Sequence, residues 1–302
     1  MKHICFDWAI KKILRDKVNF VILEGFLTEL IGDAIKIESI LESESNKVLE
    51  ESKFNRVDIL ARSSDGKLIL IEVQNSTEQD YFHRMLYGAS SLVFEYLNQG
   101  ESYSNVKKIY SVNIVYFSLG RGDDYVYEGR VEFRGRHVKD RLELSTSQQE
   151  LFKIKDIYQI FPEYYVLRVN QFDGQTKDNL DEWIYFLKNS EIKEEFSAQG
   201  LPEAKERLRE ERLEGVDREA YHRFLKDRQY EISILASTRA AAELEGWKKG
   251  IQEGLEQGLE EGLRLQQIRI AQSLKRSGSP AEFIADVTGL TIAEVNALNP
   301  EQ

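Results

Sequence analysis

The run KLILIEVQ, residues 67–74, restricts the possible folds of this chain more than any other segment. It is almost continuously apolar, which is typical of a central strand that is covered on both faces. The run FNRVDILAR, residues 54–62, precedes it, and SSDG joins the two. Asp65-Gly66 is typical of a type I′ hairpin turn, which needs positive φ angles. The two runs therefore predict an antiparallel hairpin whose second strand lies inside a sheet.

The segments around this hairpin show helical and extended patterns in turn. Apolar residues that recur every three to four positions predict helices over 6–32 and 78–98, the second capped by Ser76 or Thr77 and stopped by Gly100. Further strands are expected at 35–41, 106–119, 125–133 and 164–169. This order predicts an α/β fold in which helices flank a mixed sheet.

The character of the sequence changes near residue 178, where aromatic strands give way to charged helical sequence. We therefore predict two domains, 1–178 and 179–302. The second contains the repeat GWKKGIQEGLEQGLEEGL, residues 246–263, in which a glycine recurs every four residues beside an apolar stripe. Close approach of two such helices is one interpretation, and a flexible linker is the other, because each glycine costs about 0.8–1 kcal/mol in a helix.

The last segment, residues 271–298, predicts short helices with turns at Gly278-Ser279-Pro280 and at Gly289-Leu290-Thr291. This pattern resembles a helix-turn-helix, which reads the major groove of DNA. Its second half, TIAEVNALNPEQ, has no basic positions that would suit recognition of bases. We favour a small helical packing or dimer module.

Composition limits the classes of function. The formal net charge of −11 disfavours a protein that coats nucleic acid non-specifically. A single cysteine, Cys5, cannot form an internal disulfide, so we expect the cytoplasm as the compartment. The N-terminus lacks the apolar run of a secretory signal, and charged residues interrupt the longest apolar stretch, residues 18–31. We therefore expect no membrane span.

Two acidic residues of the hairpin are candidates for a metal site. Asp58 and Glu72 lie on the paired strands, and in a matching register they come together on one face. Gln74 shares the face of Glu72 because side chains alternate along a strand. Two carboxylates form an oxygen-rich site that suits Mg²⁺, which activates bound water and polarises phosphoryl oxygens. The alternative is an exposed pair satisfied by Arg56 or Lys67.

The segment VDILARSSDGKLILIEVQNSTEQDYFHRMLYGASSLV, residues 57–93, resembles the Rpn-type recombination-promoting nucleases, a transposase-related family of the PD-(D/E)xK nuclease superfamily. The resemblance continues upstream through FDWAIKKILRDKVNFVILEGFL and downstream through FRGRHVKDRLELSTSQQ and the glycine-periodic tail, so it covers most of the chain. It implies a restriction-endonuclease-like fold that uses Mg²⁺ or Mn²⁺ to cleave DNA. It also implies that Asp58 and Glu72 are the motif acids and that Gln74 takes the position of the lysine.

The chain departs from the superfamily pattern at two positions. Val57 replaces the proline of the motif, and Gln74 replaces the lysine, although E-x-Q is common in the family that the chain resembles. A neutral amide can orient a water or a phosphate but cannot neutralise developing charge, which predicts slower or more metal-dependent turnover.

Several positions could support this site. An acid of the first helix completes the metal site in this superfamily, which points to Glu24, with Glu29 as a competitor and a surface glutamate as the plain alternative. Arg84 and Tyr87 match the R-x-x-Y pattern of the family, and Arg84 would clamp a phosphate or pair with Glu72. An ordinary salt bridge is the alternative. His83 has no partner at metal-ligand spacing and is expected to be solvated.

The run GRVEFRGRHVKDR, residues 129–141, concentrates basic residues in an acidic chain and is the best candidate for contact with the DNA backbone. Its alternative is a solvated segment whose charges neighbouring acids balance.

We therefore expect a metal-dependent DNA endonuclease, linked by the resemblance to recombination or mobile elements, that forms a homo-oligomer through its C-terminal helices. The main alternative is a catalytically inactive nuclease fold that acts as an oligomeric interaction module. A further alternative is a sequence-specific DNA-binding protein that uses the terminal helices.

Overall fold

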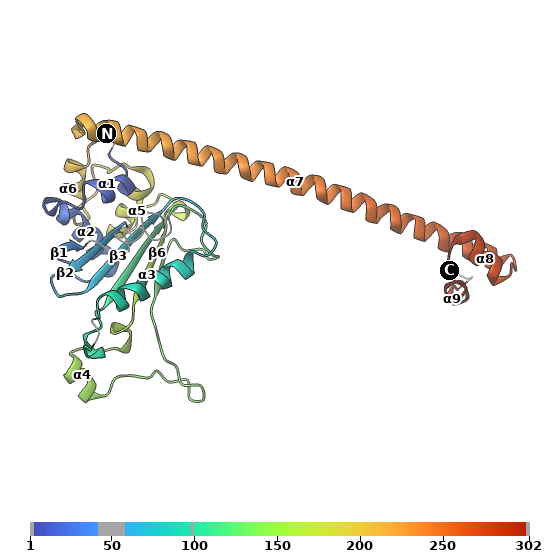
Figure 1. The fold of residues 1–302 in the computed structure, drawn as a ribbon, viewed down its shortest axis with the longest axis horizontal. Coiled ribbons are helices and arrows are strands. Elements are labelled where there is room, and N and C mark those ends of the chain that lie inside the picture. Colours follow the sequence, from blue (N-terminus) through green and yellow to red (C-terminus); the bar gives the residue numbers. More distant parts are fainter. Residues whose placement is uncertain (1–2, 42–57, 98–99, 300–302) are drawn as a thin grey trace. The chain divides into compact units, whose positions relative to one another are not determined.

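The computed structural model of the protein describes residues 3–41, 58–97 and 100–299. The chain divides into two compact units, Met1–Tyr221 and His222–Gln302. The first unit contains the sheet with its helices, and the second contains most of one long helix and the C-terminal segment (Figure 1). Val57, at the proline position of the motif, lies outside the described residues.

A mixed six-stranded sheet forms the centre of the first unit, with the strand order β1-β2-β3-β4-β6-β5. Strands β3, β4 and β6 pair in parallel, and the other neighbours pair antiparallel. The continuous apolar runs of β3 and β4 place these strands inside the sheet, where nearly all their residues are buried. The strands are β1 (Ile37–Leu41), β2 (Ile59–Ser63), β3 (Leu68–Gln74), β4 (Ile109–Val115), β5 (Val126–Gly129) and β6 (Glu163–Arg168). The predicted fold class, an α/β mixed sheet flanked by helices, is confirmed.

The hairpin of β2 and β3 has the predicted place, but its turn differs from type I′. Only Gly66 of the pair Asp65-Gly66 has a positive φ, of 82°. The turn is closed by a hydrogen bond from the Ser63 amide to the Lys67 carbonyl (2.9 Å). A single left-handed residue is typical of a longer hairpin loop, in which glycine takes that position at no steric cost.

The predicted helix over 6–32 is two helices, α1 (Phe6–Lys12) and α2 (Phe20–Ile31). Asp16 causes the interruption, because its side chain accepts a hydrogen bond from the Val18 amide (3.1 Å) and starts a new turn there. The end at Gly32 is as predicted, with a left-handed φ of 80°.

Helix α3 (Tyr81–Glu95) packs on the sheet face that carries Leu68 and Leu70. It begins after Asp80, later than the expected caps Ser76 and Thr77, and its interior residues Ala89 and Leu92 enter the same apolar cluster. Figure 1 shows this helix lying across the strands. Helix α3 therefore covers the face on which even-numbered residues of β3 lie, including Glu72.

Helices α5 (Asn179–Asn189) and α6 (Leu201–Arg207) belong to the first unit, although the sequence places them in the second domain. Trp183 of α5 packs against Phe26 of α2 with ring centroids 5.5 Å apart. Gly25 of α2 approaches the backbone of Gln199 so closely that a Cβ would lie 2.1 Å from its carbonyl oxygen. The division at 221/222 differs from the expected boundary at 178/179 because these two helices carry apolar faces that α2 covers.

The second unit consists of the remainder of α7 (Gly215–Arg276) with α8 (Ala281–Thr288) and α9 (Ile292–Ala297). Ala271 near the end of α7 packs with Ile284, Leu290 and Val295 in a small apolar cluster. The predicted turns lie at Gly278 and Gly289, which both have positive φ angles. No helix among the described residues is long and apolar enough to cross a lipid bilayer.

Candidate active site

The sheet register brings the two predicted acids together. Ile59 of β2 pairs with Ile71 of β3, and one further step in the same register sets Asp58 opposite Glu72. The Asp58 carboxylate accepts a hydrogen bond from the Val73 amide (2.7 Å), and its backbone carbonyl accepts one from Arg15 (2.6 Å). Asp58 is therefore held at the open end of the hairpin, beside the end of β3.

Glu72 is buried without full compensation for its charge. Glu72 is only 6% exposed, and its Oε2 atom has no hydrogen-bond partner among the described residues. The pKa of Glu72 is raised to about 7, chiefly by burial and also by the neighbouring charges of Asp58 and Glu78, against the opposing effect of Arg84. A buried carboxylate with an unsatisfied oxygen is stabilised by an added cation.

Arg84 of α3 places a positive charge beside Glu72. Its Nε lies 3.5 Å from Glu72 Oε2, and its Nη1 lies 3.0 Å from Glu78 Oε2. The Nε–H makes no hydrogen bond to a described residue, so the contact with Glu72 is electrostatic only. Of the two roles that the sequence left open for Arg84, the structure places it within ion-pair distance of Glu72. Tyr87, its partner in the R-x-x-Y pattern, is exposed.

Tyr81 and Asn113 complete the surroundings of Glu72, and neither was predicted from the sequence. Asn113 of β4 pairs with Glu72 in the register, and its Oδ1 accepts a hydrogen bond from the Tyr81 hydroxyl (3.3 Å). The Asn113 amide donates to the carbonyls of Ser111 and Tyr165, which fixes its orientation. The available signal was an amide side chain inside the apolar run YSVNIV.

Gln74 is half-buried at the end of β3 and follows Glu72 by two residues, so alternation along the strand puts both on one face. Its side-chain amide donates to the Ser76 carbonyl (3.3 Å). Gln74 therefore lies at the edge of the site, and its role in the chemistry stays a prediction.

Glu24 is 8% exposed, and both of its carboxylate oxygens have partners at the start of β1. Oε1 accepts a hydrogen bond from the Ile37 amide (2.9 Å), and Oε2 pairs with Lys36 (2.9 Å). Glu29 accepts hydrogen bonds from Asn179 and from the backbone of Gln199, which ties α2 to the segment around α5. In this structure both acids of the first helical segment serve contacts between elements. His83 is exposed, as expected.

The acids fit a divalent ion as a pair. Asp58 and Glu72 offer hard carboxylate oxygens, and Glu72 Oε2 has no hydrogen-bond partner among the described residues. Within the described ranges, no group of three or more His, Cys, Asp or Glu side chains is arranged to hold a metal ion. Mg²⁺ commonly uses one or two protein carboxylates and keeps several waters, so two acids suffice for it.

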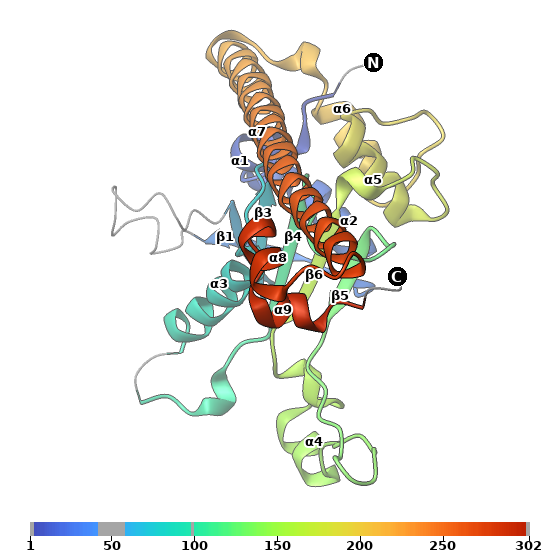
Figure 2. The same ribbon diagram turned by 90° about the vertical axis from the view of Figure 1, so that its right-hand side faces the viewer.

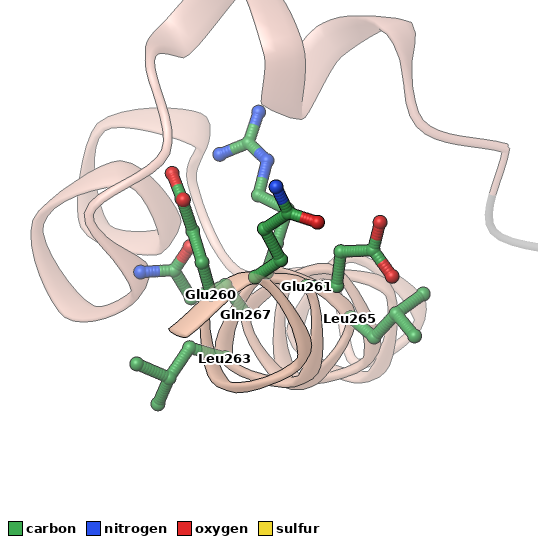
Figure 3. Close-up of a pocket in the computed structure, with 7 residues that line it drawn as sticks. Glu260, Glu261, Leu263, Leu265 and Gln267 are labelled. Carbon is green, nitrogen blue, oxygen red and sulfur yellow. The ribbon is translucent and has the colours of Figure 1, made fainter. Parts of the chain in front are cut away.

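Other parts of the described structure offer weaker candidates. A hollow beside α7 is lined by residues of this helix alone (Figure 3). They are Gln257, Glu260, Glu261, Leu263, Arg264, Leu265 and Gln267. The described helix α9, IAEVNA, contains no basic residue, and Glu294 in its first turn accepts a hydrogen bond from the Thr291 hydroxyl and pairs with Arg264. A negative charge at this helix N-terminus opposes contact with phosphates.

The sheet is mixed, and its inner strand β3 carries a buried acid near its end, opposite a second acid across the hairpin. Residues 4–235 match the family model of the PD-(D/E)XK nuclease family transposases, and the chain belongs to this family. No curated protein and no solved structure matches the chain.

Proposed function

We propose that this protein is a divalent-ion-dependent DNA endonuclease that acts in recombination or on mobile elements in the cytoplasm. The observation that carries the proposal is Glu72, a carboxylate that is 6% exposed, lies opposite Asp58 and has an oxygen without a hydrogen-bond partner in the described part of the chain. Membership of a nuclease-fold transposase family supports the proposal. Such an acid costs stability in the free protein, and binding of a cation offsets that cost.

The residues of the site take separate roles in this proposal. Asp58 and Glu72 would hold Mg²⁺ or Mn²⁺, and a bound ion of this kind supplies an activated water and polarises a phosphoryl oxygen. Arg84 lowers the pKa of Glu72 by its positive charge and so opposes the effect of burial, and Gln74 orients the attacking water or the scissile phosphate through hydrogen bonds. The hydrogen bond between Tyr81 and Asn113 keeps polar side chains fixed beside Glu72.

Cleavage of supercoiled plasmid DNA tests this proposal. We expect nicking with Mg²⁺ or Mn²⁺ that EDTA abolishes, and a loss of at least about a hundredfold in Glu72→Gln, because the variant lacks an acid of the site. Glu38→Gln, an exposed glutamate on β1, is the matched control and should cleave like the wild type. Absence of nicking by the wild type with any divalent ion would contradict the enzymatic proposal.

The variant Gln74→Lys tests the role of the amide. A lysine at this position adds a positive charge beside the two acids, so we expect faster cleavage, by about tenfold or more, and a pH profile displaced to lower pH. Gln74→Ala separates orientation from charge and should be slower than the wild type. Equal rates for all three proteins would exclude residue 74 from the chemistry.

An oligomeric interaction protein is the second candidate, and α7 favours it. Its apolar stripe is exposed at Trp247, Ile251, Leu255, Leu259 and Leu263. We propose that this stripe mediates self-association in either case. An oligomer that shows neither nicking nor divalent-ion binding would leave only the second candidate.

A further inference from the structure

A protruding segment connects β5 to β6. Residues 130–162, here called the arm, extend away from the sheet in both ribbon views and include α4 (Thr146–Phe152) (Figures 1 and 2). The tip of the arm, residues 133–142, is a small hairpin. Arg134 and Arg141 form its isolated bridge, and the Leu142 amide donates to the Phe133 carbonyl (2.9 Å).

The base of the arm is anchored to the sheet by a buried ionic cluster. Glu163 is 3% exposed and pairs with Lys108 (3.0 Å) and with Arg130 (2.7 Å). The rings of Phe133 and Phe161 also pack together, with centroids 5.6 Å apart. Fully partnered buried charges of this kind fix the geometry of the chain around them, so the arm has a defined root.

The tip carries four cations and one anion, in contrast to the net charge of −11 of the chain. Arg134 pairs with Glu132 (2.9 Å) and Arg141 with Asp156 (3.4 Å), whereas Arg136 and Lys139 are exposed at the turn between them. Lys139 has a φ of 64°, in the left-handed region that favours glycine. A lysine at this position gives the exposed turn a positive charge, although its backbone conformation is less favourable for lysine than for glycine.

We propose that the tip of the arm binds the sugar–phosphate backbone of duplex DNA that flanks the cleavage site. Gly129 pairs with Tyr164, which lies level with Ser111 and Leu70, so the arm leaves the sheet toward the end where the parallel strands begin, whereas Glu72 lies toward the end where they finish. Along the strands, Glu72 lies two residues beyond the level of Gly129, which is about 7 Å. Two to three strand spacings separate β3 from the ends of the arm, which is about 10–15 Å across the sheet. The arm therefore contributes to binding of DNA and leaves the scissile phosphate to the acids. This inference rests on the proposed function, which supplies DNA as the substrate.

Binding of a fluorescent duplex of mixed sequence to the full-length protein, in EDTA and over a range of salt concentrations, tests the proposal. We expect the double variant Arg136→Ala/Lys139→Gly to bind about tenfold more weakly at moderate salt. Its plot of log affinity against log salt should be shallower by about two, because each lost phosphate contact removes about one unit of slope. Thermal unfolding should be unimpaired, since glycine adopts the left-handed conformation freely.

Lys153→Gly is the matched control. Lys153 is also exposed, lies in the arm and has a left-handed φ of 55°, but it ends α4 away from the tip. We expect at most a small change in affinity for this variant. An unchanged slope for the double variant, or an equal loss for Lys153→Gly, would overturn the proposal. Binding to anionic lipid vesicles in place of DNA would overturn it as well.

The proposal for nuclease activity and the proposal for the arm can be disproved independently of each other. Because binding is measured without metal, arm-dependent binding by a protein that never nicks DNA would end the nuclease proposal and leave the arm as a DNA contact. Metal-dependent nicking by a double variant that binds DNA like the wild type would end the proposal for the arm alone.

Discussion

Glu72 lies at a position where the sheet and α3 leave its carboxylate almost no water. In the unfolded chain this carboxyl ionises near pH 4.5, and in the folded chain burial moves its pKa to about 7. The folded protein therefore keeps a proton that the unfolded chain has already lost between these two pH values. The contribution of the neutral carboxyl to stability is present below about pH 4.5 and is lost as the pH rises through 7.

This linkage predicts that Glu72→Gln stabilises the metal-free protein above pH 7. The free energy of unfolding should rise by at most about 3 kcal/mol, because each unit of difference between the folded and unfolded pKa of Glu72 corresponds to about 1.4 kcal/mol. Urea unfolding in EDTA at pH 5 and at pH 8 measures it, with Glu38→Gln as the control that changes little. Mg²⁺ should raise the stability of the wild type at pH 8 and leave that of Glu72→Gln unchanged. A variant that is less stable than the wild type at pH 8 would contradict the assigned burial cost.

At the residue scale, the sequence predicts the contacts that depend only on residues nearby in the chain. The pairing of Asp58 with Glu72 follows from the hairpin turn and the alternation of the strands, both of which are local. Tyr81 and Asn113 meet only because β4 pairs with β3 and α3 crosses them, which is a tertiary relation. Glu24 was open to prediction as an acid in an apolar helix, but its partners depend on where β1 begins.

The periodic glycines of helix α7 have no packing partner among the described residues. A Cβ added at any of its five periodic glycines would meet no described atom within 4 Å, so packing with a described residue explains none of them. Together they cost the helix about 4–5 kcal/mol relative to alanine. The apolar stripe repeats every four residues, more than the 3.6 of a helical turn, so it winds around the helix and favours a right-handed crossing with a partner.

The triple variant Gly250→Ala/Gly254→Ala/Gly258→Ala separates the two interpretations of this repeat. If a second copy packs closely on the glycines, added methyl groups should weaken self-association by about tenfold or more while the helix content stays the same. Sedimentation velocity over a series of concentrations measures the change. Ser237→Ala, on the same helix outside the repeat, is the control. A variant that gains stability and keeps its association would identify the repeat as a solvated linker.

Element boundaries were harder to predict than element types. The interruption between α1 and α2 depends on a single cap by Asp16, whereas the helical period continues through the segment. Similarly, α5 carries the charged composition that suggested a new domain, but its buried face includes Trp183 and Phe186. Composition averages over both faces of a helix and therefore hides the face that packs.

At the scale of the whole molecule, the first unit closes only when its two ends meet. The Ile4 amide donates to the Leu208 carbonyl (2.6 Å), and Phe6 packs against Trp183 and Phe186. Tyr221, at the start of α7, packs against Trp8 with ring centroids 5.2 Å apart. The apolar core of the unit thus uses residues from both sides of the boundary that the sequence suggested.

Truncation tests this organisation. A chain that ends at residue 178 lacks Trp183 and Phe186, which pack on Phe6 and Phe26, and we expect it to lose cooperative unfolding and to aggregate. A chain that ends at residue 230 keeps Tyr221 and should unfold cooperatively like the first unit of the full protein. Near-ultraviolet circular dichroism during thermal unfolding compares the two. A stable, cooperative 1–178 fragment would restore the boundary at 178/179.

The contact between Ile4 and Leu208 has a consequence for synthesis on the ribosome. About two hundred residues must be translated before the N-terminal segment meets its partners, which takes about 10–40 s at usual elongation rates. During this interval Phe6 lacks Trp183 and Phe186, and Trp8 lacks Tyr221, the rings that pack on them in the finished fold. The nascent chain therefore presents the apolar side chains of Phe6 and Trp8 to chaperones during this interval, and slow elongation prolongs that exposure.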